Sequence, residues 1–540
     1  MKKNSILRKV VVIILIFSMI FSSFTPVVMA ASMTDIRVGL TNLYKNKSTL
    51  KIKTTKIGMG YSVKDRFINE TVFSSRTGFT FQVAKGDYYI LDNTYLSYRD
   101  AMNVVKQTEK LGVKAYPVSI YRETWKVYIG GYDSKSELEE AKKKLGTAYG
   151  YSYQGPYADN GHRILVLGEN LTMLIDAKTF GAYPQFKAVS LNENRKAILN
   201  LGTRQYRGRI EIGRYGNSSL TAVNIINIES YLYGVVPSEM ISSWPAESLK
   251  AQAVCARSYA LSKTKYGTDS NLTSPYRITD TTSYQSYKGY GVETTATTAA
   301  VNATRGFVIT YQGNIISSYY FSTSGGRTES SYNVWGSKAP YLTSVIDEYE
   351  TEPEKGPWIV AMSKSEIARR LSNAGMVVGN VKKITIQSET ASNRVNKLQV
   401  IGDYRTQVLQ TEQIRTIFEL YSTKFKIVTS GQNSDRVVAL SSNGKSTVDL
   451  SDCYVINGDN KIKALDQKDQ QIYVVKSSDN LTTFIKEGPT SDDVYYFVGL
   501  GYGHGVGMSQ SGAKGLAKQG YSYMDILQYY FQGCSIEYIN

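Results

Sequence analysis

One acidic side chain stands out for its apolar surroundings. Glu239 lies between the pairs Pro237-Ser238 and Met240-Ile241, and two valines precede them at positions 235 and 236. A carboxyl group in such a setting is partly desolvated, which raises its pKa and keeps it protonated near neutral pH. A protonated carboxyl can serve as a general acid, for example at the leaving oxygen of a glycosidic bond. The residues alone also allow a solvated acid in a loop before a helix, and this alternative stays open.

A helix is predicted directly after this acid. Ser243 or Trp244 can cap it, and Pro245 suits its first turn because the missing N–H would be unpaired there anyway. Two cations, Lys250 and Arg257, recur at helical spacing and would lie on one side of the helix. A narrow apolar seam beside them would let another element approach closely. It comprises Leu249, Ala253, Ala256 and Ala260.

The other residue that could do chemistry is His504, one of two histidines in the chain. It lies in the glycine-rich run GYGHGVGMSQ, so we expect its ring to be exposed in a cleft or held by its own hydrogen bonds, unless the run is a plain turn. The glycines match neither the G-x-G-x-x-G nor the Walker pattern of phosphate loops. Two histidines and scattered cysteines also do not favour a three-ligand zinc site.

Two serines could complete a hydrolase triad with His504 and an acid. Neither Ser324 nor Ser509 stands in the G-x-S-x-G pattern, so the sequence ranks both below Glu239 as catalytic residues. Ser324 belongs to the segment 322–326, which is rich in hydroxyl groups and glycine. Such a loop could bring backbone N–H groups to a ligand, or it could be an ordinary turn.

The first thirty residues are typical of a secretory signal peptide. Four cations at positions 2, 3, 8 and 9 precede an apolar run from Val10 to Phe21, and residues 28–30 fit a cleavage site near Ala30. The run is shorter than the roughly 20 residues that span a bilayer. We therefore expect a secreted, cell-wall-associated protein, with membrane attachment only if this segment is retained as an anchor.

Charge and composition narrow the range of partners. The formal net charge is +17, and a basic exported protein suits an anionic surface such as a cell wall or a nucleic acid. We expect no nucleic-acid partner, because the chain has no zinc-finger spacing, no long basic helical stripe and no recognisable binding module. The 43 tyrosines suit stacking on sugar rings but also strand surfaces in general, so they do not decide the question alone.

The three cysteines are too few for a disulfide scaffold in an exported chain of this size. A single bridge between Cys453 and Cys534 could form. Cys255 lies beside the alanine seam, where we expect it to be a small buried hydrophobic residue.

At 540 residues the chain is too long for one core, and its patterns indicate a multidomain α+β protein with mixed sheets. Alternating runs at 31–84 predict a small strand-rich unit, and residues 163–360 would form a main domain with strands before the Glu239 helix. Residues 361–490 read as an inserted peripheral unit, after which 491–540 would complete the main domain. Within that domain, the turn Gln312-Gly313-Asn314 predicts a hairpin.

Residues 85–150 alternate between strands and helices. Capping boxes at Ser97 and Ser134 begin the two helices, and the order βαββα, closed by a further strand, predicts a small α/β sandwich. With WKVYIGGYDSKSELEEA, this stretch resembles the sporulation-related repeat (SPOR) domain, a peptidoglycan-binding module. The resemblance implies binding of glycan strands through the face of the sheet.

Three blocks resemble the SpoIID/LytB family over about Arg163 to Asn540, in the family's order and spacing. They are GVVPSEMISSWPAESLKAQAVCARSYAL, YYFSTSGGRTES and GYGHGVGMSQSGAKGLAKQGYSYMDILQYYF. Long-known members are a sporulation peptidoglycan hydrolase and a protein described as an amidase enhancer. The resemblance implies a SpoIID-type catalytic core that acts on glycan strands as a lytic transglycosylase. It would cut the β-1,4 bond between N-acetylmuramic acid and N-acetylglucosamine and leave a 1,6-anhydro sugar.

The resemblance also assigns roles to residues. Glu239 corresponds to the acid of the family's PSEM motif and would be catalytic; one carboxyl suffices because the muramic acid's own 6-hydroxyl attacks. Lys250 and Arg257 match basic helix positions of the family and would steady the acid or bind the muramyl carboxylate. Further substrate-binding residues implied at the cleft are Tyr259, Ser324, His504, Ser509 and Gln510.

One departure from the family pattern concerns metal. Some sporulation members carry a Cys/His zinc cluster just before a Q-x-Y motif, whereas residues 279–284, which precede Gln285-Ser286-Tyr287, contain neither Cys nor His. We therefore expect no metal and no other cofactor. The alternative function is a non-catalytic cell-wall-binding protein that enhances an N-acetylmuramoyl-L-alanine amidase, which would then be a partner. The basic charge and the module at 85–150 fit both functions equally.

Overall fold

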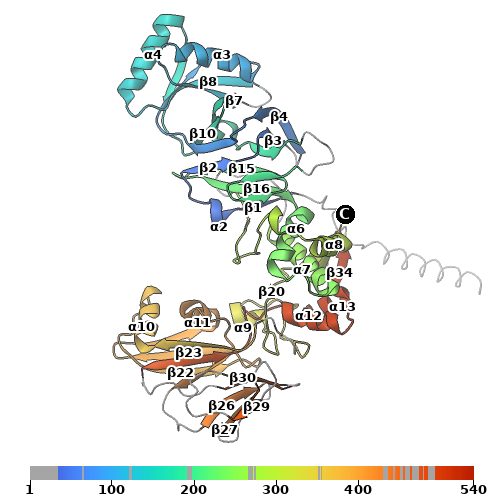
Figure 1. The fold of residues 1–540 in the computed structure, drawn as a ribbon. Helices are drawn as coiled ribbons and strands as arrows, with labels where there is room; N and C mark the ends of the chain where they lie inside the picture. Colours follow the sequence, from blue (N-terminus) through green and yellow to red (C-terminus); the bar gives the residue numbers. More distant parts are fainter. Residues whose placement is uncertain are drawn as a thin grey trace, which may run out of the picture.

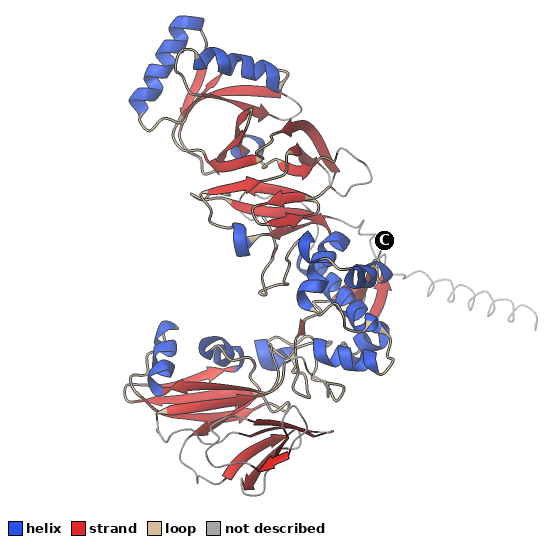
Figure 2. Ribbon diagram, in the orientation of Figure 1, coloured by secondary structure: helices blue, strands red, loops and turns tan. Residues whose placement is uncertain are grey.

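The computed structural model describes residues 35–539 except 64–65, 121–123, 191–196, 265–271, 273–274, 351–352, 354 and the connections between strands from 430 to 492. The predicted signal segment lies outside the described residues. Helices and several mixed sheets confirm the multidomain α+β class (Figures 1 and 2). Large sheets stand at one end of the molecule, a group of helices in the middle and further sheets at the other end (Figure 2). No described helix is both long and apolar enough to cross a membrane.

Seven strands form the first sheet, in the order β17-β1-β16-β15-β12-β3-β4. They are β1 (Asp35–Gly39), β3 (Lys56–Val63), β4 (Arg66–Ser74), β12 (Gln185–Ala188), β15 (Arg209–Gly213), β16 (Thr221–Asn227) and β17 (Ile278–Thr279). β1 pairs antiparallel with β16, and β3 with β12. The prediction of a separate unit at 31–84 is therefore wrong for the described residues: the alternating runs are strands, but their partners come from later in the chain.

Ten strands form the second sheet, in the order β14-β13-β2-β5-β10-β11-β7-β8-β6-β9. They are β2 (Thr49–Ile52), β5 (Phe79–Val83), β6 (Tyr88–Leu91), β7 (Ala115–Ile120), β8 (Thr124–Gly130), β9 (Tyr153–Tyr157), β10 (Arg163–Gly168), β11 (Leu171–Asp176), β13 (Leu199–Leu201) and β14 (Arg204–Tyr206). Strands β6 to β9 enclose α3 (Tyr98–Glu109) and α4 (Lys135–Tyr149), which gives the predicted βαββα order with its closing strand. Ser97 and Ser134 cap the two helices as predicted.

One face of this βαββαβ unit is covered by the chain itself. Tyr88, Val118 and Tyr128 form a buried cluster with Leu174 of β11, separate from the main core. Tyr88 and Tyr128 are only 2% and 1% exposed, and the Arg163 guanidinium lies 5.1 Å from the centre of the Tyr88 ring. The centre of the face that was expected to bind glycans is therefore inaccessible, because the sheet continues from β7 into β11 and β10, whose Leu174 and Leu165 pack against it.

The helical region surrounds one central helix. α7 (Ala246–Thr264) contacts α6 (Ile228–Glu239), α8 (Thr295–Ala303), α12 (Gln510–Lys518) and α13 (Tyr523–Tyr530). Nearly every residue of α7 from Ser248 to Ala260 is buried, so the predicted alanine seam is one part of a helix enclosed on all sides. Cys255 is buried as predicted. Cys453 lies outside the described residues, so its bridge to Cys534 stays a prediction.

Segments far apart in the sequence complete this region. β18 (Phe307–Tyr311) and β19 (Asn314–Ile315) form the predicted hairpin, and β18 also pairs with β34 (Ser535–Tyr538) near the end of the chain. β20 (Tyr320–Phe321) pairs parallel with β33 (Met508–Ser509). Shorter helices are α2 (Thr41–Tyr44), α5 (Ala177–Phe180), α9 (Ser331–Trp335) and the 3₁₀ turn η1 (Tyr290–Val292).

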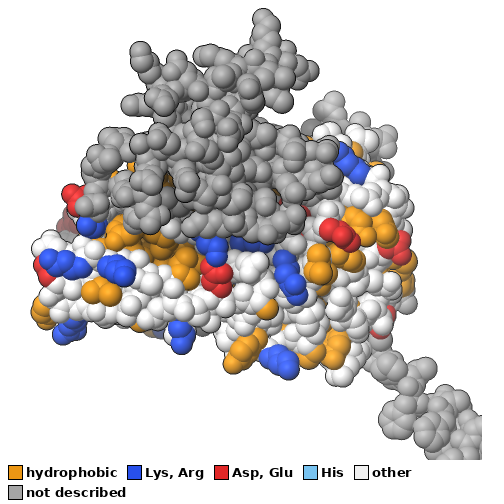
Figure 3. Space-filling model, turned by 90° about the horizontal axis from the view of Figure 1, so that it is seen from below, with side chains coloured by type: hydrophobic (Ala, Val, Ile, Leu, Met, Phe, Trp, Pro, Cys, Tyr) orange, Lys and Arg blue, Asp and Glu red, His pale blue; other side chains and the backbone are white. Residues whose placement is uncertain are grey.

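The insertion forms the other end of the molecule (Figure 1). β21 (Trp358–Ser363) and β25 (Phe425–Thr429) flank β32 (Val494–Gly499). Strands from the two ends of the insertion therefore pair with each other. α10 (Lys364–Asn373) and α11 (Thr411–Phe418) share a core with the sheet of β22 (Val381–Glu389), β23 (Val395–Gly402) and β24 (Thr406–Gln410). Six further strands are β26 (Arg436–Ser441), β27 (Gly444–Asp449), β28 (Tyr454–Ile456), β29 (Ile462–Ala464), β30 (Tyr473–Ser477) and β31 (Asn480–Phe484). On the face seen in Figure 3, Lys and Arg side chains are spread among hydrophobic ones.

Candidate active site

Glu239 is the last residue of α6, a helix that the sequence patterns did not predict. Pro237 lies in its final turn, where the missing N–H removes one helical hydrogen bond. The helix nevertheless continues through it, since the Met240 N–H donates to the Val236 carbonyl at 2.9 Å. The acid is thus held at a helix end and not in a free loop.

The segment Gln285-Ser286-Tyr287 lies against α6 and contacts the acid. This approach requires Gly234, because a Cβ there would lie 2.6 Å from the Tyr287 ring. The Ser286 backbone N–H donates a hydrogen bond to Glu239 Oε1. Gln285 is 1% exposed and donates through Nε2 to the Tyr320 hydroxyl at 3.1 Å. The segment therefore fixes both the carboxyl group and the tyrosine beside it.

The environment of Glu239 favours its protonated form. Burial raises the pKa of Glu239 to about 7, although the Ser286 N–H, hydrogen bonds with Tyr320 and Gln510, and the positive charge of Lys288 all act in the opposite direction. A carboxyl group with this pKa exists in both forms near neutral pH. It can therefore donate a proton and later take one back.

Gln510 reaches the acid from the C-terminal block. It is the first residue of α12, is 7% exposed, and forms a side-chain hydrogen bond with Glu239. Its Nε2 also donates to Gln252 Oε1 at 3.3 Å. Ser509 is the cap of α12 and accepts from the Gly512 N–H at 3.1 Å. The pairing of β33 with β20 thus places Gln510 at the acid and Ser509 at a helix cap.

The two cations of α7 have partners of their own. Lys250 Nζ donates to Glu247 Oε1 at 2.6 Å, and the other oxygen of Glu247 accepts from the Tyr523 N–H at 2.8 Å. Arg257 is 1% exposed and forms a bidentate pair with Glu229 at 2.8 and 2.7 Å. The prediction that Arg257 faces a glycan disagrees with this burial, because its guanidinium is enclosed with the carboxylate that compensates its charge. Arg257 thus joins α7 to α6, whereas the Lys250 pair lies within α7, and it is Glu247 that joins α7 to α13.

His504 is held as a neutral ring. Its Nδ1 accepts a hydrogen bond from the Val506 N–H at 3.0 Å, and the rings of Tyr319, Phe321 and Trp335 surround it with centroids 5.3 to 6.0 Å away. Burial lowers the pKa of His504 to about 3, and the charges of two nearby arginines act in the same direction. Of the two arrangements predicted for this histidine, the structure shows the ring held by its own hydrogen bonds.

Tyr259 belongs to the same aromatic group. Its ring packs edge-on against Tyr319 at 5.3 Å, and Lys263 Nζ lies 5.3 Å from its centre. Tyr259 itself is only 6% exposed, whereas Trp335, 4.5 Å from Tyr319, is 40% exposed. Within this aromatic group, Trp335 is therefore the accessible ring that could stack on a sugar.

Ser324 binds an acid other than Glu239. Its side chain is fully buried, and its hydroxyl and N–H both donate to Glu350, as does the Gly325 N–H at 2.9 Å. Burial, together with the charge of Asp347, raises the pKa of Glu350 to about 8. Asp347 in turn accepts from the Tyr530 hydroxyl at 2.8 Å. The segment 322–326 thus directs backbone N–H groups at a carboxyl group, as its composition allowed, but that carboxyl group belongs to the chain.

These contacts do not assemble a Ser-His-acid triad among the described residues. Nδ1 of His504 accepts from the Val506 N–H, and the Ser324 hydroxyl donates to Glu350. The Ser509 hydroxyl accepts from the Gly512 N–H in the first turn of α12. A triad would need a serine hydroxyl bonded to the histidine ring. Glu239 is therefore the stronger candidate.

The turn before Gln285 is closed by backbone hydrogen bonds. The Tyr284 N–H donates to the Thr281 carbonyl at 3.0 Å, and the Tyr287 N–H to the Asp280 carbonyl at 3.3 Å. Within the described part of the chain, no group of three or more His, Cys, Asp or Glu side chains could hold a metal ion.

Three groups around the acid were missed by sequence reasoning. Tyr320 lies in the block YYFSTSGGRTES, and Ser286 lies in the Q-x-Y segment, so both stood in stretches already singled out. Ser286 contacts the acid through its backbone N–H, a group that every residue except proline carries, so the residue type does not indicate this role. Lys288 carried no signal in the sequence, because only the fold brings its charge close to Glu239.

Comparison with known proteins finds similarity over the part of the chain that contains Glu239. The SpoIID family model, described as stage II sporulation protein, matches residues 216–311. The amidase enhancer of Bacillus subtilis (strain 168) is 30% identical over 396 residues, which cover 70% of this chain and 50% of the relative. The chain thus spans about half the length of that relative. Stage II sporulation protein D of the same strain is 28% identical over 338 residues, covering 61% of this chain and 78% of the relative.

A further match has the same description. Stage II sporulation protein D of Bacillus amyloliquefaciens is 28% identical over 326 residues, covering 58% of this chain and 75% of the relative. The residues matched by the family model include α6, α7 and Gln285-Ser286-Tyr287, so they contain Glu239 and the backbone donor that holds it. These matches support the SpoIID/LytB family for this chain.

Proposed function

We propose that this protein is a peptidoglycan lytic transglycosylase with Glu239 as its general acid and base. The observation that carries the proposal is the Glu239 carboxyl at the end of α6, whose burial raises its pKa to about 7 while Ser286, Tyr320 and Gln510 orient it. Similarity to SpoIID proteins and to an amidase enhancer supports an activity on the cell wall. The signal segment, with cleavage near Ala30, supports export to that wall.

A single carboxyl can perform both proton transfers of this reaction. Glu239 donates its proton to the glycosidic oxygen, and the bond from that oxygen to C1 of N-acetylmuramic acid breaks. The 6-hydroxyl of the same sugar bonds to C1, and the carboxylate takes up the hydroxyl proton. No water is consumed, the product is a 1,6-anhydro sugar, and the acid is restored for the next cycle.

Product analysis tests this function. Purified sacculi, and glycan strands freed of stem peptides, are digested with the protein, and the products are analysed by mass spectrometry. We expect muramic acid ends that are one water lighter than hydrolytic ends. Reducing ends in their place would show a hydrolase, and intact strands would contradict any cleavage of glycosidic bonds by this chain.

The cleavage rate is expected to fall above about pH 7, because the general acid loses its proton there. Above that pKa the protonated fraction, and with it kcat, decreases about tenfold per pH unit. Replacing Lys288 with Gln removes a charge that favours the carboxylate, so the pKa rises and the alkaline limb moves to higher pH. The pH profiles of kcat for the two proteins measure this shift. Lys382→Gln, on β22 of the insertion, is the charge-matched control, and a limb that stays in place or moves to lower pH would argue against Glu239 as the acid.

A second function is favoured by the relative named amidase enhancer, which is 30% identical to this chain. In that case the protein would bind the wall and stimulate a cell-wall amidase without cleaving glycans. Stem peptides would be released only when a partner amidase is added, and Glu239→Gln would retain the stimulation. The βαββαβ unit at 88–157 would serve as a SPOR-like wall-binding module in either function. Because the centre of its sheet is covered, binding would use other surfaces.

A further inference from the structure

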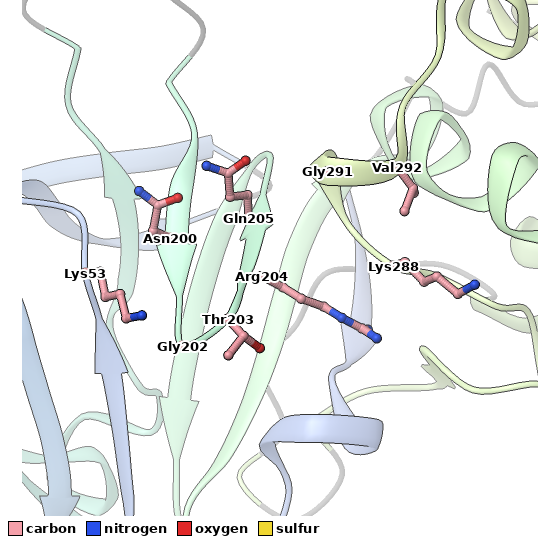
Figure 4. A pocket seen from close by; sticks show the side chains of 9 residues that line it. All are labelled: Lys53, Asn200, Gly202, Thr203, Arg204, Gln205, Lys288, Gly291 and Val292. Atoms are coloured by element: carbon pink, nitrogen blue, oxygen red, sulfur yellow. The ribbon is translucent and has the colours of Figure 1, made fainter.

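A pocket lined mostly by residues with polar side chains opens beside the segment that holds Glu239. It has a volume of about 520 Å³ and lies between two walls (Figure 4). One wall is the β13–β14 hairpin, which contributes Arg204, with Lys53 beside it at the end of β2. The other wall is the stretch 288–292, which begins at Lys288, two residues after the N–H that contacts the acid.

The two walls are joined firmly. Arg207, directly after β14, forms a bidentate ion pair with Glu293 at 2.6 Å for both hydrogen bonds, and its guanidinium lies 5.0 Å from the centre of the Tyr290 ring. Gly289 allows the backbones to touch, because a Cβ there would lie 2.3 Å from the Gln205 carbonyl oxygen. The pocket is therefore formed in advance by contacts that do not use its own lining cations.

All charged side chains that line the pocket are cationic: Lys53, Arg204 and Lys288. Arg204 extends from the hairpin toward the wall that bears Lys288 (Figure 4). Its Nη1 is buried and has no hydrogen-bond partner among the described residues. The acid on which its charge acts is Asp280, which is itself buried. The guanidinium also interacts with the Tyr206 hydroxyl, but no acid lines the pocket itself, so its charge there suits an anionic ligand.

We propose that this pocket binds a carboxylate of the peptidoglycan substrate. The inference rests on the proposed function and extends it to cations other than those of α7. Lys250 and Arg257 are held by Glu247 and Glu229, whereas no acid is among the residues that line the pocket with Lys53, Arg204 and Lys288. A bidentate contact from Arg204, in a pocket whose other charged lining residues are two lysines, suits a carboxylate, and the volume accommodates the group that bears it.

The pocket and the acid are linked through Lys288, which lines the pocket and whose charge acts on Glu239. A glycan strand with its scissile bond at Glu239 would therefore bring a substituent of a muramic acid to the pocket. Two sources supply the carboxylate. One is the lactyl group of a muramic acid freed of its peptide, and the other is the stem peptide itself.

Binding to a catalytically inactive protein tests the proposal independently of cleavage. Glu239→Gln protein is titrated with glycan oligomers that carry stem peptides and with oligomers freed of them. Each is used before and after its carboxyl groups are capped as neutral amides. Replacing Lys53 and Arg204 together with Gln is expected to raise Kd about tenfold for uncapped ligand, as for the loss of a charge-assisted contact. Capping the carboxyl groups is expected to raise Kd by the same factor when Lys53 and Arg204 are in place. It is expected to cause no further rise in Kd for the doubly substituted protein.

The control removes the same charge elsewhere: Lys382→Gln with Lys383→Gln, both exposed on β22, should leave Kd unchanged. The unfolding midpoint of each variant shows whether loss of fold is the cause. The single substitution Lys53→Gln, at an exposed side chain, repeats the binding measurement with Arg204 in place. The ligand whose affinity falls identifies the lactyl or the stem-peptide carboxylate. Equal affinity for capped and uncapped ligands, or an equal loss in the control, would overturn the proposal. If the protein with its native Glu239 bound the ligands normally but cleaved none of them, the proposed transglycosylase activity would be rejected. The proposed carboxylate pocket would still stand.

Discussion

Replacing Glu239 with Gln is expected to lower kcat for glycan cleavage by about 10²–10⁴-fold, the range that general acid-base catalysis contributes. The amide keeps the size of the side chain, and its oxygen can still accept from the Ser286 N–H, so the fold around it should be retained. What is lost is the proton that the leaving oxygen needs and the base that takes one back. Initial rates of anhydro-sugar formation, with equal unfolding midpoints for the two proteins, measure this effect.

Glu247→Gln is the matched control for this change. Glu247 is an acid of the same helical region, but it is paired with Lys250 and with the first turn of α13. We expect this substitution to leave kcat within a few-fold of the unsubstituted protein. If Glu239→Gln behaved like this control, the carboxyl at the end of α6 would have no part in the chemistry.

Replacing Arg257 with Met is expected to destabilise the protein by about 3–5 kcal/mol, because it leaves Glu229 buried and without its ionic partner. Both side chains are 1% exposed, and the guanidinium also donates to the Phe307 carbonyl at 3.0 Å. The loss would therefore reach α6, α7 and β18 together. Denaturant unfolding followed by tryptophan fluorescence measures the change in the free energy of unfolding.

Two further variants separate the buried pair from a general effect of charge. Replacing Glu229 with Leu in the Arg257→Met protein removes the unpaired carboxylate and should restore much of the stability. Arg369→Met removes an arginine whose ion pair with Glu366 lies on the surface, and we expect little change there. Reduced glycan binding by an Arg257→Met protein with normal stability would instead support the original expectation that this arginine faces the substrate.

Local sequence patterns were sufficient to predict those structures that depend on residues close together in the chain. The capping boxes at Ser97 and Ser134 and the turn at Gln312-Gly313-Asn314 were found where the sequence predicted them. Each of these features is closed within a few residues, so the residue types alone specify it. The α6 helix escaped the same reasoning because Pro237 in its last turn reads as a helix breaker, and only the packing around it maintains the helix.

The sequence also identified Glu239 as the residue to examine, because its apolar neighbours indicated a raised pKa and its motif matched the family. The roles of the two helical cations depended on the fold. Helical spacing places Lys250 and Arg257 on one side of α7, but α7 is enclosed by other helices, so a guanidinium that would be free on a surface must pair with Glu229. Likewise Gln510, Ser286 and Lys288 meet the acid only after β33 joins β20 and Gly234 admits the segment after residue 284. Contacts between residues so distant in the chain depend on packing, and packing is a property of the whole fold that no local pattern contains.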